Sequence, residues 1–257
     1  MNYIQYTVSD RIGYITLNRP EKRNALNFEV VAELKTAFAQ AEADDQVKVV
    51  ILRAIGESFC AGADLAYLQQ LQHFSVEENL ADSNHLKELF HQIYTLKKVV
   101  IAQVQGNALA GGCGLVNVCD FAFAVPEARF GYTEVRIGFI PAIVMVFLIR
   151  KVGEANARHL VLTGDLLPAN DVKNMGLIYQ VIQKEKLEVE VLSFAQRIIT
   201  SNSAHALMLT KQMIASVQSM KLEDALVFAS KMNANARGSD DCKKGIDSFL
   251  KKEKITW

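Results

Sequence analysis

The sequence has no excess of charge of either sign. Its 28 basic and 28 acidic side chains give a formal net charge of zero. Proteins that mainly bind nucleic acid usually carry a basic excess, so this balance argues against that class, although a local basic patch is compatible with it. No apolar run approaches the roughly 18 residues of a membrane-spanning helix. The N-terminus, MNYIQYTVSD, has no basic segment followed by an apolar stretch, so we expect no signal peptide.

Cysteine and proline are also scarce. The four cysteines, Cys60, Cys113, Cys119 and Cys242, do not have the spacing of metal ligands. We therefore expect reduced thiols in a cytoplasmic protein, and no metal site. Four prolines in 257 residues leave few forced breaks. This length suits one large domain, or one domain with an appendage.

Strand-like and helix-like segments alternate along the first two thirds of the chain. Strands are expected over residues 4–8, 12–17, 47–54, 99–104 and 121–125. The first two surround Asp10 as a hairpin. Helices are expected over 28–43, with Asn27 as its cap, and over 77–97, because apolar residues recur there at helical spacing. The recurring order strand, strand, helix predicts an α/β fold of repeated units.

The pattern becomes purely helical near residue 185. Helices are expected over 187–200, 204–217, 222–236 and 240–251. We therefore divide the chain into a body, residues 1–185, and a helical C-terminal region, residues 186–257. Periodicity does not distinguish a region that folds back on the body from one that packs against other subunits.

The most informative segment is GNALAGGCGLVNVCD, residues 106–120, which follows a predicted strand. Gly111 and Gly112 open a short apolar helix there. The free N–H groups at a helix start, together with the positive end of its dipole, suit a developing negative charge. The alternative is a glycine turn that only permits close packing. The GxGxxG spacing of nucleotide-binding loops is absent.

A second turn of this kind is FCAGADL, residues 59–65, also after a strand. Its small residues permit close approach of a ligand, and the N–H of Ala63 is a second candidate donor. Two such loops could hold one carbonyl oxygen between two N–H groups, which is the geometry of an oxyanion hole.

The third segment is FGYTEVRIGFIP, residues 130–141. Glu134 lies there among apolar and aromatic residues, and a carboxylate against apolar walls has a raised pKa and can exchange protons near neutral pH. The alternative is a structural glutamate that pairs with Arg136.

In this order, the three segments resemble the crotonase superfamily, also called the enoyl-CoA hydratase/isomerase family. The resemblance begins at LNRPEKRNAL, residues 17–26, includes LTG at 162–164 and ends at GIDSFLKKEK, residues 245–254. It implies an α/β fold of the ClpP/crotonase type, a spiral of ββα units with a C-terminal helical trimerisation region. The resemblance is less specific for the reaction, because members of the family catalyse hydration, double-bond shifts, dehalogenation and C–C cleavage on one scaffold.

The resemblance also implies roles for individual residues. In such proteins two peptide N–H groups bind the thioester carbonyl and stabilise an enolate, and the matching positions are Ala63 and Gly111. Hydratases of the family usually place two glutamates beside a water molecule. The second matches Glu134, whereas the first falls at Gly114, a substrate-contacting position where this sequence departs from the pattern.

This departure leaves the reaction open. A lone glutamate can deprotonate water and then protonate the α-carbon, or it can move a proton between the α and γ carbons, as related isomerases do. An acid elsewhere, or a carboxylate of the substrate, could also assist. The stretch EVRIGFIPAIVMVFLIRKVGE resembles the methylglutaconyl-CoA hydratase branch. We therefore favour a hydratase of branched or carboxylated enoyl-CoA thioesters, 3-methylglutaconyl-CoA among them. Enoyl-CoA isomerase is the alternative reaction, and a non-catalytic CoA- or RNA-binding protein is the alternative class.

The resemblance finally implies how CoA is bound and how the chain assembles. The matching positions are Arg19, Lys22 and Arg23 near the phosphates, Ala25, Ala61 and Leu65 near the adenine, and Phe249, Lys251 and Lys252 near a neighbouring subunit's CoA. No separate cofactor is expected, because CoA is part of the substrate. We expect a homotrimer or a dimer of trimers, with neither nucleic acid nor a membrane as partner.

Overall fold

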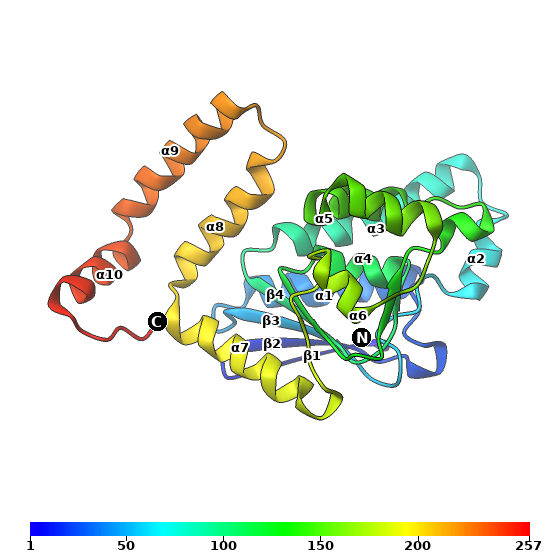
Figure 1. The fold of residues 1–257 in the computed structure, drawn as a ribbon, viewed down its shortest axis with the longest axis horizontal. Coiled ribbons are helices and arrows are strands. Elements are labelled where there is room, and N and C mark those ends of the chain that lie inside the picture. Colours follow the sequence, from blue (N-terminus) through cyan, green and yellow to red (C-terminus); the bar gives the residue numbers. More distant parts are fainter.

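A computed structural model describes all 257 residues, which form an α/β body and a projecting helical arm (Figure 1). The body contains a six-stranded sheet with the order β1-β2-β3-β4-β6-β9. These strands are β1 (Ile4–Ser9), β2 (Ile12–Leu17), β3 (Val49–Ala54), β4 (Val99–Val104), β6 (Phe121–Ala124) and β9 (Gln180–Val181). β1 and β2 form the antiparallel hairpin predicted around Asp10, and the other neighbours are parallel.

A second, smaller sheet fixes the positions of the loops that form the candidate site described below. It has the order β5-β7-β8, with β5 (Ala108–Leu109), β7 (Arg129–Gly131) and β8 (Leu167–Pro168). One strand from each sheet followed by a helix makes a ββα unit, as in β4-β5-α4 (Gly111–Val118) and β6-β7-α5 (Ala142–Thr163). The predicted α/β fold of repeated ββα units is confirmed.

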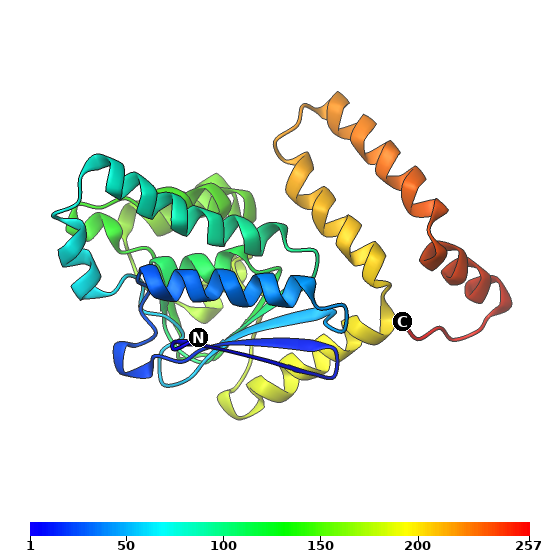
Figure 2. The same cartoon turned by 180° about the vertical axis from the view of Figure 1, so that it is seen from behind.

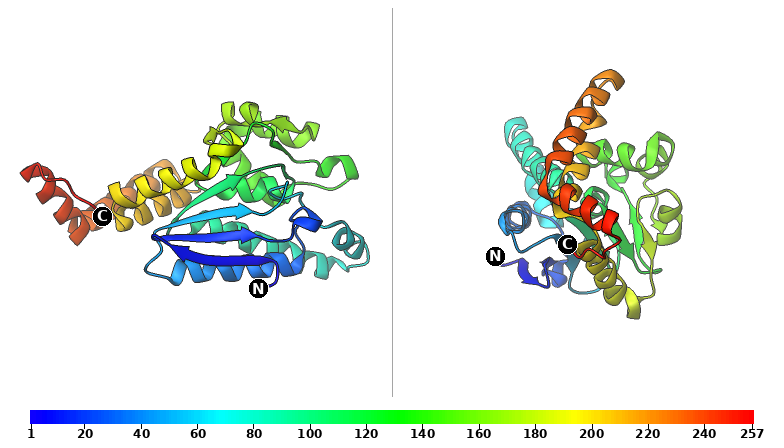
Figure 3. Two further views of the ribbon diagram at one scale, coloured as in Figure 1. Left: turned by 90° about the horizontal axis from the view of Figure 1, so that it is seen from below. Right: turned by 90° about the vertical axis from the view of Figure 1, so that its left-hand side faces the viewer.

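Helices cover both faces of the large sheet (Figure 3). On one face α1 (Phe28–Ala43) packs against β1 and β2, and α3 (Val76–Thr95) packs against α1. On the other face α7 (Leu187–Ser201) packs against β3, β4 and β6. Asn27 caps α1 by accepting the N–H of Val30 at 2.9 Å, as predicted. The remaining body helices are α2 (Leu65–Leu71), α6 (Ala169–Asn174) and the short turns η1 (Pro20–Lys22), η2 (Glu134–Ile137) and η3 (Lys184–Lys186).

One hydrophobic core of 55 buried residues runs through the body. It extends past residue 185, because the buried face of α7, from Leu187 to Ile199, belongs to it. The part that leaves the body therefore begins after α7. The division of the chain at residue 185 into two regions remains a prediction.

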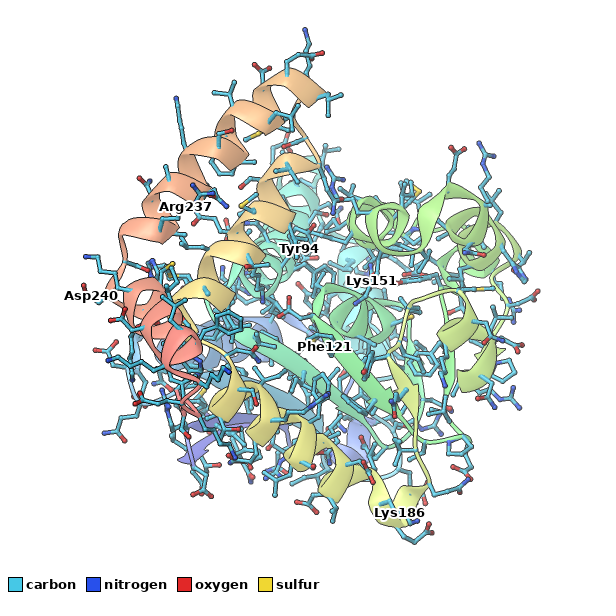
Figure 4. The ribbon with its side chains drawn as sticks, turned by 60° about the vertical axis from the view of Figure 1, so that its left-hand side comes forward. Tyr94, Phe121, Lys151, Lys186, Arg237 and Asp240 are labelled. Carbon is cyan, nitrogen blue, oxygen red and sulfur yellow. The ribbon has the colours of Figure 1, made fainter.

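The arm consists of α8 (Ala204–Val217), α9 (Leu222–Gly238) and α10 (Asp240–Lys251), which extend away from the sheet (Figure 2). Only α8 runs along the body, where Tyr94, Phe121 and Lys151 lie beside it, while Arg237 and Asp240 lie farther out (Figure 4). The chain end returns to the end of α7, where the N–H of Trp257 donates to the carbonyl of Thr200 at 3.2 Å. No helix has both the length and the apolar composition needed to cross a membrane.

Candidate active site

Two loops that follow parallel strands lie side by side at the centre of the candidate site. The loop after β3 joins the segment after β4 through Cys60. The N–H of Cys60 donates to the carbonyl of Asn107 at 3.1 Å, and its carbonyl accepts from Leu109 at 2.9 Å. Parallel pairing therefore continues beyond the strands and aligns the ends of the two loops.

Gly62 and Ala110 are in contact where these loops turn into helices. Gly62 has a φ of +94°, and a Cβ on it would lie 2.9 Å from the Cβ of Ala110. Both the left-handed backbone and the lack of space therefore require glycine at position 62. Ala63 and Gly111 follow these two contacting residues directly, so they are neighbours across the two loops.

The amide groups of Ala63 and Gly111 both lack a protein acceptor. Gly111 is the first residue of α4, a position without an intrahelical partner. The preceding Ala110 has φ 48° and ψ −121°, a strained conformation for an alanine, which sets the direction of the Gly111 N–H. Two free N–H groups beside a helix start can stabilise one oxygen atom that gains negative charge.

Glu134 reaches the same place from β7. β7 pairs with β5, and Ala110 donates its N–H to the carbonyl of Gly131 at 2.8 Å, three residues before Glu134. The Oε2 atom of Glu134 is buried and has no hydrogen-bond partner. Arg136, the alternative partner considered from the sequence, pairs instead with Asp165, with 3.2 Å between Nη2 and Oδ1.

Burial raises the pKa of the Glu134 carboxyl group, and a hydrogen bond from its own backbone N–H offsets only part of this rise. No protein cation lies close enough to form an ion pair with it. A carboxyl group in such surroundings can gain and lose a proton near neutral pH. Glu134 thus has the properties of an acid–base group, and the strand before it is hydrogen-bonded to Ala110, the residue that precedes the free N–H of Gly111.

The buried thiols near the site are unreactive at neutral pH. Cys113, on α4, is fully buried, and burial raises its pKa to about 12. The carboxylate of Glu134 contributes to this rise, which places the thiol near it. At neutral pH the thiolate fraction is negligible, so Cys113 is not a nucleophile. All four cysteines are free, as predicted.

Gly114 faces side chains of the body. A Cβ at this position would lie 2.5 Å from Cγ1 of Val144 and 2.9 Å from Cζ of Phe90. Both side chains are buried. The space that a glutamate would need at position 114 is therefore filled by apolar groups.

The residues predicted near CoA have different environments. Arg19 is largely buried, and its Nη1 lies 2.7 Å from Oδ2 of Asp64. Lys22 and Arg23 are exposed and make no ion pair. They are thus the available cations of this segment.

The predicted backbone contacts lie beside the loop of Ala63. Ala25 is buried and Ala61 is half-buried, and the N–H of Ala61 donates to the carbonyl of Arg23 at 3.0 Å. Leu65, at the start of α2, has an exposed fraction of 79%. The Ala61–Arg23 hydrogen bond thus joins the loop of Ala63 to the segment that carries Ala25.

The C-terminal candidates lie elsewhere. Phe249 is 81% exposed on α10, and Lys252 follows this helix. α10 lies at the far side of the arm, away from α2 and α4, the helices that follow the two loops (Figure 1). The structure therefore does not bring Phe249 and Lys252 to the site of their own chain.

Residues 7–257 match the family model described as enoyl-CoA hydratase/isomerase. The chain belongs to this family. A Thermus thermophilus protein described as a candidate enoyl-CoA hydratase is 41% identical over 241 residues, which are 94% of this chain and 95% of that protein. A crotonyl-CoA hydratase of Syntrophomonas wolfei is 33% identical, with coverage of 96% and 95%.

Solved structures of the enoyl-CoA hydratase/isomerase family have the same fold. An enoyl-CoA hydratase structure from Mycobacterium smegmatis superposes with a TM-score of 0.93 at 30% identity, covering 99% of this chain and 98% of that one. The chain thus has the α/β crotonase fold with C-terminal helices.

Sequence reasoning missed Asp64, which follows Ala63 directly and pairs with Arg19. It lies inside the FCAGADL segment and caps α2 by accepting the N–H of Ala66 at 2.8 Å. An aspartate directly before a helix is a typical N-cap, and this was the available signal. Its buried partner, Arg19, is distant in sequence and had no such signal.

Proposed function

We propose that the chain is an enoyl-CoA hydratase, an enzyme that adds water across the α,β double bond of an acyl-CoA thioester or removes it. The observation that carries this proposal is the unpartnered carboxyl oxygen of Glu134 beside the free N–H groups of Ala63 and Gly111. The names of relatives at 31–41% identity, all enoyl-CoA hydratases, support the same reaction.

The reaction needs one acid–base group and one site for negative charge. In hydration, the Glu134 carboxylate takes a proton from water, and the oxygen of that water bonds to the β-carbon. The electron pair of the double bond moves toward the thioester, whose oxygen is held by the N–H groups of Ala63 and Gly111. Glu134 then returns the proton to the α-carbon, so the carboxylate is regenerated and no other co-reactant is needed.

Double-bond isomerisation is the second candidate. It uses the same two N–H groups and a single carboxylate, and it needs no group that orients water. The filled space at Gly114 favours this alternative, because no second glutamate lies there. The two reactions differ in whether water enters the product.

For the finer specificity, we propose a branched or carboxylated acyl group, 3-methylglutaconyl-CoA among them. This rests on the apolar segment that follows Glu134 and on its likeness to the methylglutaconyl-CoA hydratase branch. The assembly we propose is a homotrimer or a dimer of trimers in the cytoplasm, supported by the exposed apolar side chains of the arm.

The experiment is a panel of acyl-CoA thioesters, containing crotonyl-CoA, 3-methylglutaconyl-CoA and a β,γ-enoyl-CoA. Hydration removes the absorbance of the conjugated thioester, whereas isomerisation of the β,γ-enoyl-CoA creates it. We expect hydration of at least one conjugated thioester, with incorporation of ¹⁸O from labelled water. Isomerisation without any ¹⁸O uptake across the panel would overturn the hydratase proposal.

A further inference from the structure

Arg19 and Asp64 form a buried ion pair beside the loop that carries Ala63. Their side chains are 13% and 6% exposed, and Nη1 lies 2.7 Å from Oδ2. The other carboxylate oxygen, Oδ1, accepts the N–H of Ala66 at 2.8 Å and caps α2. Burial by itself raises the pKa of Asp64, but the hydrogen bonds from Arg19 and Ala66 outweigh it and lower the pKa. Each oxygen of Asp64 thus has a fixed partner.

Arg19 is itself held on several sides. Its Nη1 also donates to the carbonyl of Ala25 at 3.3 Å, and its backbone N–H donates to Oδ1 of Asn24 at 2.8 Å. Its guanidinium lies over the ring of Tyr3, 5.3 Å from the centroid. A phosphate ligand needs guanidinium donors that face the phosphate, and here the group is turned toward Asp64.

The pair acts on the residue next to Asp64. The N–H of Leu26 donates to the carbonyl of Gly62 at 2.7 Å, and its carbonyl accepts from Asp64 at 2.8 Å. Leu26 therefore holds the residues on both sides of Ala63, while the N–H of Ala63 stays free. The Arg19–Asp64 pair fixes the far end of this short ladder.

We infer that Arg19 is a positioning residue that directs the Ala63 N–H at the thioester oxygen, and that it is not a ligand of the CoA phosphates. The identity of that oxygen rests on the proposed function. Without the guanidinium, the Asp64 carboxylate would be buried and unpaired, and it would turn toward water. A displacement of about 1 Å in a catalytic group costs up to about 100-fold in rate.

The test compares Arg19→Met with Arg158→Met on two substrates. Arg158 is an exposed arginine of α5 that pairs with Glu154, outside the site. The substrates are one enoyl group carried on CoA and the same group carried on pantetheine, which lacks the nucleotide phosphates. We expect Arg19→Met to lower kcat by about 10- to 100-fold on both thioesters with KM nearly unchanged, and Arg158→Met to change neither. A rise in KM confined to the CoA thioester would overturn the inference.

Hydrogen exchange gives a readout that does not depend on turnover. The peptide covering residues 59–67 should exchange faster in Arg19→Met than in the wild type and in Arg158→Met. Unchanged exchange there would overturn the positioning role. If the methionine variant fails to fold, Arg19→Lys replaces it, because this variant keeps the positive charge. It should show a smaller loss of kcat and the same faster exchange. If the wild-type protein hydrates neither thioester, only the proposed function is contradicted. The exchange comparison still tests the role of Arg19 in that case.

Discussion

At the scale of single residues, the proposed mechanism depends on the lone carboxyl group of Glu134. Glu134→Gln keeps the shape of the side chain but removes the proton transfer. We expect kcat for hydration to fall by about 10²- to 10⁴-fold or more, while the Kd for the acyl-CoA stays near the wild-type value. Glu154→Gln, on the exposed face of α5, is the matched control. Near-wild-type turnover in Glu134→Gln would contradict the single-acid mechanism.

The raised pKa of Glu134 affects the pH dependence of both the reaction and the stability of the fold. For hydration the carboxylate form is required, so kcat/KM should fall on the acid side at a pH above the ordinary glutamate value of 4.5. For stability, a raised folded-state pKa means that the contribution of this group is fully present below the unfolded-state pKa. It is lost as pH rises through the folded-state pKa.

Glu134→Gln should therefore raise Tm near neutral pH, and the difference from the wild type should vanish in acid, where both side chains are neutral. Thermal unfolding monitored by circular dichroism across this pH range measures it. An equal Tm difference at all pH values would show that burial of the charge is not the cause.

At the scale of elements, the long segments could be predicted and the short ones could not. The predicted bounds of α1, β2 and β4 agree with the structure, because each has many residues in one clear period and α1 has its cap in Asn27. Strands β5, β7, β8 and β9 have two or three residues, too few to show any alternation. Their positions depend on pairing partners that are far away in sequence.

α4 lies between α3 and α5, and Gly114 lies at this contact. Gly114→Glu would place its Cβ only 2.5 Å from Cγ1 of Val144 and 2.9 Å from Cζ of Phe90, and the carboxylate would add further bulk and charge among apolar groups. We expect a loss of about 3 kcal/mol or more in the free energy of unfolding in urea, and no gain in crotonyl-CoA hydration. Gly114→Glu/Val144→Ala should recover part of the stability. A stable single variant with faster hydration would show that the position faces substrate instead.

α8 is attached to the body by a buried cation. Nζ of Lys211, with a side chain 7% exposed, lies 2.6 Å from Oδ2 of Asp120 and donates to two backbone carbonyls of the body. Lys211→Met should lower the free energy of unfolding by about 2–4 kcal/mol, since it leaves Asp120 partly buried without its partner. Lys243→Met, which breaks an exposed pair on α10, should cost less than about 1 kcal/mol. Equal effects in urea unfolding would contradict the role of Lys211 as the anchor of α8.

At the scale of the whole molecule, the site combines segments that are up to about seventy residues apart in the chain. Ala63, Gly111 and Glu134 were named from the sequence because each lies in a distinctive motif. The Arg19–Asp64 pair was not, because an arginine in a basic turn gives no sign of being buried. The filled space at Gly114 was not predictable either, since it depends on how α3 and α5 pack around α4.

The last prediction at this scale concerns the arm, along which apolar side chains are exposed. Leu222, Leu226 and Val227 of α9 are 70%, 59% and 56% exposed, and Phe249 on α10 is 81% exposed. Groups of exposed apolar side chains mark interaction surfaces. We expect light scattering to give three or six times the chain mass of 28.5 kDa.

Dissociation should also affect substrate binding, because α10, which carries Phe249 and is followed by Lys252, lies far from α2 and α4 of its own chain (Figure 1). Leu226→Asp/Val227→Asp should lower the mass toward one chain and raise KM for the CoA thioester, while KM for the pantetheine thioester stays the same. Lys231→Asp adds an acid to an exposed polar position of the same helix and should leave the mass unchanged. A monomeric wild type would contradict the assembly. A dissociated variant with wild-type KM for the CoA thioester would leave the neighbouring arm without a part in CoA binding.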